Sequence, residues 1–285
     1  MSLVVLLTDF GVRDYFVGVM KGVIAKINPD VKVVDLTHEI EPQNVRQAAF
    51  ALWACRKFFP TDSIFVNVVD PGVGSSRRII CGRIDGQIFV APDNGLLDYV
   101  VSEAREIDLY EVTNKNFFLV SKGSTSLDVS STFHGRDIFA PTAAYISRGT
   151  KLDELGKLFD YRRVAPFYTN IKKGDNAGEV VYRDGFGNVF TSFLWDDSLL
   201  NGTSSLRINS RIVSKFVRTY SEGVSSQDRE EQEKTKVSTR HKHGSGKELI
   251  CVKGSSGLVE IAINLGDAAK ILKSEIGQKV VLISK

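Results

Sequence analysis

The sequence of 285 residues lacks several features that define whole classes of protein. Its three cysteines, Cys55, Cys81 and Cys251, are widely spaced among apolar residues, so we expect buried small side chains rather than a disulfide framework or a zinc motif. The longest aliphatic run, residues 3–7, is much shorter than the about 20 apolar residues that span a bilayer. The first residues also lack the basic and apolar regions of a secretory signal. We therefore expect a soluble, cytoplasmic protein with no membrane partner.

An excess of one charge is also absent, because 37 Lys and Arg are balanced by 34 Asp and Glu. A net charge of +3 does not supply the concentrated basic face that binds a nucleic-acid backbone, so we expect no nucleic-acid partner. What is present is a globular composition, with 42% hydrophobic residues and 17 phenylalanines. At about 150 residues per domain, the length predicts roughly two domains.

Two fragments resemble nucleotide-binding motifs but lack the context that those motifs need. Residues 9–11 read DFG, and the fragment from His134 to Asp137 resembles a kinase catalytic loop. In a kinase the catalytic loop precedes DFG, and a glycine-rich loop and a strand lysine lie upstream of both. Here the order is inverted, and the chain before residue 9 has no room for the glycine-rich loop and the lysine. The glycines at 72–74 do not continue into a dinucleotide fingerprint, because Arg77 occupies the third glycine position and no long helix follows directly. The sequence therefore predicts neither a kinase nor an NAD-binding protein.

The first part of the chain alternates short β-branched runs with segments of helical periodicity. This alternation predicts an N-terminal α/β domain, residues 1–168, with a mostly parallel central sheet flanked by helices. A helix over 136–147 requires Pro141 to fall within its first turns. The expected strands lie at 3–7, 31–36, 63–69, 78–84, 87–91 and 106–112, some of them antiparallel, and the other expected helices lie at 16–27 and 44–59.

The C-terminal part, residues 169–285, has a different pattern. Short apolar runs punctuated by glycine predict closely spaced strands in a compact β-barrel-like domain. Between these strands, residues 221–247 hold five acidic and six basic residues, no aromatic residue and only two valines. Such a segment cannot bury itself, so we expect a mobile, charged insertion there.

Polar side chains and turn residues follow four successive predicted strands of the first domain. Ligands bind beyond the carboxyl ends of the strands in an open α/β sheet, because the loops meet there. Each segment alone is weak, since Asp, Asn, Gly and Pro are ordinary turn formers, but together they favour a binding site. The four segments are Thr8–Gly11, Thr37–Glu39, Asp70–Gly74 and Pro92–Gly95, and they make Asp9, Asp70 and Asn94 candidate site residues.

Six motifs in order give a more specific indication. They are TDFG (8–11), VVDPGVGSSRR (68–78), APDNGLL (91–97), FHGRDIFAP (133–141), DGFGNVFT (184–191) and GSSGLVEIA (254–262). Together they resemble the S-adenosyl-L-methionine hydrolase (adenosine-forming) family, which is related to the fluorinase and chlorinase enzymes. The resemblance implies S-adenosylmethionine as substrate, no cofactor or metal, and a homotrimer with active sites between the N-terminal domain of one subunit and the C-terminal domain of the next.

The resemblance also implies roles for individual residues. It assigns a hydrolytic triad to Asp70, Arg77 and His134, and a ribose-binding carboxylate to Asp9 with Asp14 in the same wall. The remaining contacts implied are Asn94 at the substrate, Phe186 and Asn188 at the adenine, and Asp184, Ser255 and Glu260 toward the methionine end. Two features depart from the family pattern, namely residues 256–258, where relatives tend to carry an aromatic residue or an arginine, and the insertion at 221–247.

The chemistry of these residues leaves the identity of the nucleophile open. Free water has a pKa of about 15.7, so it must lose a proton during attack or be held where attack is favoured. Arg77 cannot act as the base, and Asp70, if paired with Arg77, is a feeble base but a well-fixed acceptor. His134 titrates near neutrality and is the better proton acceptor on chemical grounds. Positioning can contribute up to about 7–11 kcal/mol and a general base about 10²–10⁴-fold, so both hydroxide and positioned water stay possible.

Two other functions are compatible with parts of the pattern. A halogenase of the same family would use a halide as nucleophile, but its members carry a tyrosine where Asp70 stands, and a carboxylate there would repel an anion. A non-catalytic sensor of adenosine or S-adenosylmethionine would bind without turnover and use the charged insertion to contact a partner.

Overall fold

The structure is a computed structural model that describes residues 3–119, 129–162, 164–171, 176–223 and 248–284. The chain divides into two compact units, Met1–Pro166 (unit 1) and Phe167–Lys285 (unit 2). The predicted mobile insertion lies, from residue 224 onward, outside the described residues. No helix within the described ranges is long and apolar enough to cross a membrane.

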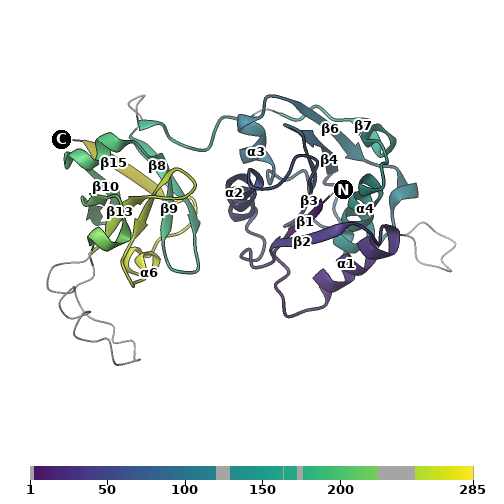
Figure 1. The fold of residues 1–285 in the computed structure, drawn as a ribbon, viewed down its shortest axis with the longest axis horizontal. Helices are drawn as coiled ribbons and strands as arrows, with labels where there is room; N and C mark the ends of the chain where they lie inside the picture. Colours follow the sequence, from purple (N-terminus) through teal and green to yellow (C-terminus); the bar gives the residue numbers. More distant parts are fainter. Residues whose placement is uncertain (1–2, 120–128, 163, 172–175, 224–247, 285) are drawn as a thin grey trace. The chain divides into compact units, whose positions relative to one another are not determined.

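Unit 1 is built on a seven-stranded sheet with the order β2-β1-β3-β5-β4-β6-β7 (Figure 1). The pairs β2–β1, β1–β3 and β3–β5 are parallel, whereas β4 and β6 pair antiparallel with their neighbours. The predicted α/β fold is therefore confirmed, with an antiparallel extension on one side of the parallel strands. The strands are β1 (Leu3–Thr8), β2 (Lys32–Thr37), β3 (Ile64–Val68), β4 (Ile79–Ile84), β5 (Gln87–Pro92), β6 (Ile107–Val112) and β7 (Gly156–Leu158).

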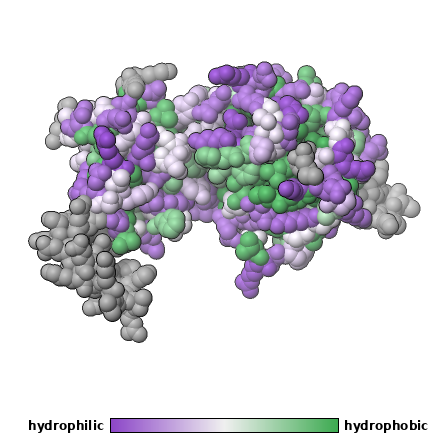
Figure 2. Space-filling view, in the orientation of Figure 1, coloured by the Kyte–Doolittle hydropathy of each residue, from purple (hydrophilic) through white to green (hydrophobic). Residues whose placement is uncertain are grey.

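Helices cover both faces of this sheet. Alternate residues of β1 enter opposite cores: Val4 and Leu6 pack in the cluster that holds the residues of α1 and α4, and Val5 and Leu7 pack in the cluster of α2 and α3. Burial on both faces explains why this strand reads as an unbroken apolar run. Figure 2 shows hydrophobic residues in the middle of the visible face of unit 1, surrounded by hydrophilic ones. The helices are α1 (Phe16–Ile27), α2 (Val45–Arg56), α3 (Asp98–Glu103) and α4 (Ala140–Ser147).

The predicted helix at 136–147 consists of two parts. A π-helical turn, η2 (Gly135–Phe139), comes first, and α4 continues from it with Pro141 at its start. Proline is tolerated there because the carbonyl of Asp137, four residues before Pro141, accepts instead from the backbone N–H of Leu119 at 2.8 Å. The wider π turn begins directly after His134 and was not predicted from the sequence.

Unit 2 is an eight-stranded sheet with the order β11-β10-β15-β8-β9-β14-β13-β12, curled around a main apolar core with a smaller apolar cluster at β12 and β13. All its described pairs are antiparallel except β12–β13. This confirms the predicted barrel-like β domain. The strands are β8 (Ala177–Arg183), β9 (Val189–Leu194), β10 (Ser204–Ile208), β11 (Arg211–Val213), β12 (Phe216–Val217), β13 (Ile250–Lys253), β14 (Leu258–Ala262) and β15 (Lys279–Ser284), and the short helix is α6 (Ala268–Leu272).

Candidate active site

The sheet of unit 1 brings four of the predicted site residues to one edge. Strands β1, β2, β3 and β5 are parallel, so the loops that follow them, including those of Asp9, Asp70 and Asn94, emerge at the same edge. Strand β4 runs in the opposite direction and begins with Ile79 opposite Pro92. Arg77 therefore lies at this edge as well.

Asp70, Arg77 and His134 are in direct contact. The Nε of Arg77 donates to both carboxylate oxygens of Asp70, each at 2.9 Å, and its Nη2 also donates to Oδ2. The same Nη2 lies 2.7 Å from Nδ1 of His134. The side chains of Asp70 and Arg77 are only 4% and 10% exposed, so bulk solvent screens this ion pair weakly. One guanidinium thus holds a carboxylate and an imidazole that are far apart in the sequence.

Close backbone packing brings these three residues together. Gly74, with φ of +79°, lies so near Ser131 that an added Cβ would be 2.3 Å from the Ser131 carbonyl oxygen. This approach joins the loop before Arg77 to the segment before His134. The side-chain amide of Asn94 donates to the carbonyl of Val69 at 2.9 Å, which ties the loop after β5 to the end of β3.

The contact with Arg77 determines the protonation state of His134. A guanidinium has only donors, so Nδ1 of His134 must accept, and the proton of the neutral ring is on Nε2. Burial lowers the pKa of His134, and the charge of Arg77 lowers it further, against the opposing effects of Asp70 and Asp137. The lone pair that would accept a proton is therefore occupied. This geometry does not support the preference for His134 as the proton acceptor.

The loop of Asp9 is fixed by its neighbours. Oδ2 of Asp9 accepts a hydrogen bond from the backbone N–H of Gln43 at 2.7 Å, and Gly11 donates to the carbonyl of His38 at 2.7 Å. The imidazole of His38 is buried and lies between Thr8 and a carboxylate, 2.9 Å from the Thr8 hydroxyl, as expected of a structural histidine. Asp14 is exposed just before α1.

In unit 2, Asp184 and Asn188 form the hairpin loop between β8 and β9. Oδ1 of Asp184 accepts from the backbone N–H groups of Phe186 and Asn188 at 3.0 and 2.8 Å, and Oδ2 accepts from the Asn188 side chain at 2.9 Å. Gly187 has a φ of +87° and lies against Asp267. The ring of Phe186 is 83% exposed, so it is available for stacking.

Glu260 is a buried carboxylate among the described residues of unit 2. It is 3% exposed on β14 and accepts a hydrogen bond from the hydroxyl of Tyr220 at 2.9 Å. Burial raises the pKa of Glu260, the charge of Asp184 raises it further, and hydrogen bonds from Tyr220 and the backbone of Ser255 oppose both effects. Asp184, Ser255 and Glu260 therefore belong to one polar cluster.

Tyr220 is the residue of this cluster that sequence reasoning missed. It is the last aromatic residue before the charged insertion, and it lies in none of the six motifs. Its hydrogen bond crosses 40 positions of the chain, so only the folded structure reveals the pairing.

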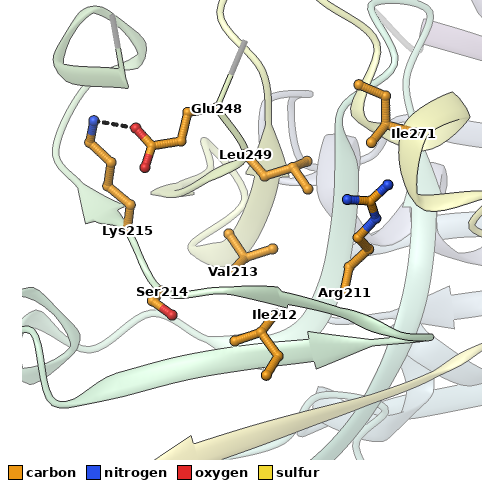
Figure 3. A pocket seen from close by; sticks show the side chains of 8 residues that line it. All are labelled: Arg211, Ile212, Val213, Ser214, Lys215, Glu248, Leu249 and Ile271. Atoms are coloured by element: carbon orange, nitrogen blue, oxygen red, sulfur yellow. Dashed lines mark hydrogen bonds and ion pairs between the residues drawn. The ribbon is translucent and has the colours of Figure 1, made fainter. Parts of the chain in front are cut away.

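Metal ligation does not mark the site among the described residues. The described residues contain no group of three or more His, Cys, Asp or Glu that could hold a metal ion. An open pocket of about 880 Å³ in unit 2 is formed by none of the predicted site residues (Figure 3). Its lining consists of Arg211, Ile212, Val213, Ser214, Lys215, Glu248, Leu249 and Ile271.

Comparison with known families covers both units. Residues 4–156 match the SAM hydroxide adenosyltransferase N-terminal domain, and residues 178–281 match the C-terminal domain of the same family. The chain belongs to the SAM hydroxide adenosyltransferase family. This membership agrees with the resemblance carried by the six sequence motifs.

Individual members of the SAM hydroxide adenosyltransferase family and its relatives match over different lengths. An (R)-S-adenosyl-L-methionine hydrolase of Thermus thermophilus is 32% identical, over 97% of this chain and 98% of its own. An (R)-S-adenosyl-L-methionine hydrolase of Methanocaldococcus jannaschii is 29% identical, over 99% of this chain and 96% of its own. A fluorinase of Actinopolyspora mzabensis is 30% identical over 68% of this chain and 72% of its own. A crystal structure of an uncharacterized conserved protein from Thermotoga maritima aligns with a TM-score of 0.79 at 32% identity, covering 98% of this chain and 100% of that one.

Proposed function

We propose that this protein hydrolyses S-adenosylmethionine to adenosine and L-methionine, with water attacking the 5′ carbon of the ribose. The observation that carries the proposal is the contact among Asp70, Arg77 and His134 at the carboxyl edge of the sheet. Relatives named (R)-S-adenosyl-L-methionine hydrolase, which match nearly the full chain, support the same reaction.

The reaction is a displacement at carbon. A lone pair of the water oxygen forms the new C5′–O bond while the C5′–S bond breaks. The electron pair of that bond returns to the sulfonium sulfur, which becomes the neutral thioether of methionine. The water loses one proton, so the products are adenosine, methionine and H⁺. No cofactor is needed, because the positive sulfur already makes methionine a good leaving group.

The three residues act by holding the water. A carboxylate has about four acceptor positions, and Arg77 occupies three of those on Asp70, which leaves one for a water O–H. His134 presents Nε2–H as a donor to the water oxygen, since its Nδ1 is bound to Arg77. Asp70 is then the first acceptor of the proton, which passes on to solvent. Positioning supplies most of the rate in this scheme, because no strong base faces the water.

The other site residues suit the rest of the substrate. The Asp9 carboxylate can accept from both hydroxyls of the ribose, which discriminates against deoxyribose by leaving an acceptor unmatched. Phe186 offers an exposed ring for adenine, and Asn188 offers amide groups for its edge. The ammonium of methionine would meet Glu260, since Asp184 already accepts three hydrogen bonds within its hairpin. Asp14, Asn94 and Ser255 remain predicted substrate contacts.

One assay distinguishes this function from its alternatives. Purified protein is incubated with S-adenosylmethionine, with and without chloride, and the products are separated by chromatography. We expect adenosine and methionine in equal amounts in both mixtures. A 5′-chlorinated nucleoside would show a halogenase, although the fluorinase relatives match only about two thirds of the chain. Tight binding without products would show a sensor.

A further inference from the structure

We propose that Tyr220 is a positioning residue for Glu260, which it keeps ionised and oriented to bind the ammonium group of the substrate. The inference rests on the proposed function for the identity of the substrate. It starts from the hydrogen bond of 2.9 Å between the Tyr220 hydroxyl and Oε2 of Glu260.

Glu260 needs such a partner because of where it lies. Its side chain is 3% exposed, and among the described residues no Lys or Arg forms an ion pair with it. The residues paired with it on the neighbouring strands, Val252 on β13 and Phe190 on β9, carry no charge. A buried carboxylate without a cation tends to take up a proton. A protonated carboxyl would lose most of its attraction for an ammonium.

The groups that face Glu260 have opposing effects. The charge of Asp184 raises its pKa, as burial does, whereas the Tyr220 hydroxyl and the backbone N–H of Ser255 stabilise the ionised form. An added Cβ at Gly254 would lie 1.9 Å from Oε1, so the carboxylate fits directly against this backbone. Two hydrogen bonds leave about two acceptor positions of the carboxylate for a ligand.

Tyr220 is itself held in place. It begins a short 3₁₀ turn, η6 (Tyr220–Gly223). The Glu222 carboxylate ties this turn to the residues just before it, because it accepts from the Thr219 hydroxyl at 3.1 Å and from the backbone N–H of Arg218 at 3.4 Å. The hydroxyl is therefore presented to Glu260 by a fixed piece of chain. Tyr220 as a whole residue is 41% exposed and is not part of the apolar clusters of unit 2, so the hydroxyl can be removed without opening a core cavity.

The test uses Tyr220→Phe in the full-length protein. Because a hydrogen bond to a charged group stabilises it substantially, we expect the variant to bind S-adenosylmethionine roughly tenfold more weakly, as measured by calorimetry. The KM should rise by a similar factor, and kcat should be nearly unchanged. The acid limb of kcat/KM should move to higher pH, because Glu260 loses a group that favours its ionised form. Adenosine, which has no ammonium, should bind equally to both proteins.

Two further variants make the test specific. Tyr110→Phe removes another tyrosine hydroxyl that donates to a carboxylate, that of Asp108 at 3.3 Å in unit 1, and should change none of these values. In a Glu260→Gln background, Tyr220→Phe should have no further effect on binding. Should Tyr220→Phe fail to fold, Tyr220→Gln, which keeps a donor, takes its place and should show a smaller loss.

The outcomes separate the two proposals. Unchanged binding of S-adenosylmethionine by Tyr220→Phe, or an equal loss of adenosine binding, overturns the role of Tyr220. A wild-type protein that binds S-adenosylmethionine without turnover overturns the hydrolase function alone, since the binding comparison still tests Tyr220. A wild-type protein that does not bind S-adenosylmethionine at all overturns both.

Discussion

At the scale of single residues, the contact between Arg77 and His134 decides how the site works. Residue types alone favoured the histidine as proton acceptor, because an imidazole titrates near neutrality. In the structure, the guanidinium occupies Nδ1, which leaves His134 as a hydrogen-bond donor through Nε2. The sequence contains both residues, but the direction of this hydrogen bond depends on atoms 57 positions apart in the chain.

The first prediction concerns the groups that hold the water. Asp70→Ala and His134→Ala should each lower kcat by about 10²-fold or more while S-adenosylmethionine still binds, because positioning of the nucleophile is lost. Stopped assays of product formation measure kcat, and calorimetry measures the binding of S-adenosylmethionine. Asp93→Ala is a control, since Asp93 forms a more exposed carboxylate–arginine pair with Arg78 at 2.7 Å outside the triad. Wild-type turnover in either triad variant would remove that residue from the mechanism.

The second prediction concerns the titration of His134. Its pKa should lie below the ordinary value of 6.5, because burial and Arg77 both disfavour the charged ring. Between the lowered pKa and 6.5 the unfolded chain binds more protons than the folded one, so stability should rise with pH in that window. NMR titration of labelled histidine, assigned with His134→Gln, measures the value. A pKa above 6.5 would contradict the neutral, Arg77-bound ring.

At the scale of elements, periodicity and capping signals were sufficient to locate most helices and strands of unit 1. The helix expected at 16–27 is α1, and the strand expected at 87–91 is β5. The π turn after His134 and the short helix α3 were not predicted. A π turn depends on how its segment packs against neighbours, which the spacing of apolar residues does not encode. Strand β1, which is buried from Val4 to Thr8, was recognisable because both of its faces are covered.

The third prediction concerns the loop that carries Arg77. Gly74→Ala should destabilise the protein and lower kcat strongly, because the new Cβ would lie 2.3 Å from the Ser131 carbonyl and separate Arg77 from His134. Overpacking of this kind typically costs about 1–3 kcal/mol. Gly149→Ala is the control, with a φ of +99° but nothing within 4 Å of the added Cβ. Thermal unfolding and turnover are measured for both, and equal effects would show that only backbone strain matters.

At the scale of the whole molecule, the chain consists of two units of different class, both of which match one family. The candidate residues are divided between them, with the triad and Asp9 in unit 1 and the Asp184–Glu260 cluster in unit 2. The homotrimer implied by the resemblance, with active sites between subunits, stays a prediction, as does a cytoplasmic location.

The fourth prediction concerns this assembly. Light scattering coupled to size-exclusion chromatography should give the mass of three chains. If the active sites need neighbouring copies, activity per chain should fall when the protein is diluted to concentrations at which the trimer dissociates. Mixing Asp70→Ala subunits, which are low in kcat, with Glu260→Gln subunits, which bind substrate weakly, offers a direct check. Recovered activity in the mixed trimers would support shared sites, whereas a fully active monomer would exclude them.

Local sequence was enough to establish the strands and helices, the change from an α/β to a β pattern, and the ordered motifs that indicate the family. These features depend on neighbouring residues, whose spacing along the chain is printed in the sequence. The proton position on His134, the hydrogen bond of Tyr220 to Glu260 and the approach of Gly74 to Ser131 became apparent only in the folded chain. Each depends on distances between segments far apart in sequence, which are set by how the sheets and loops pack.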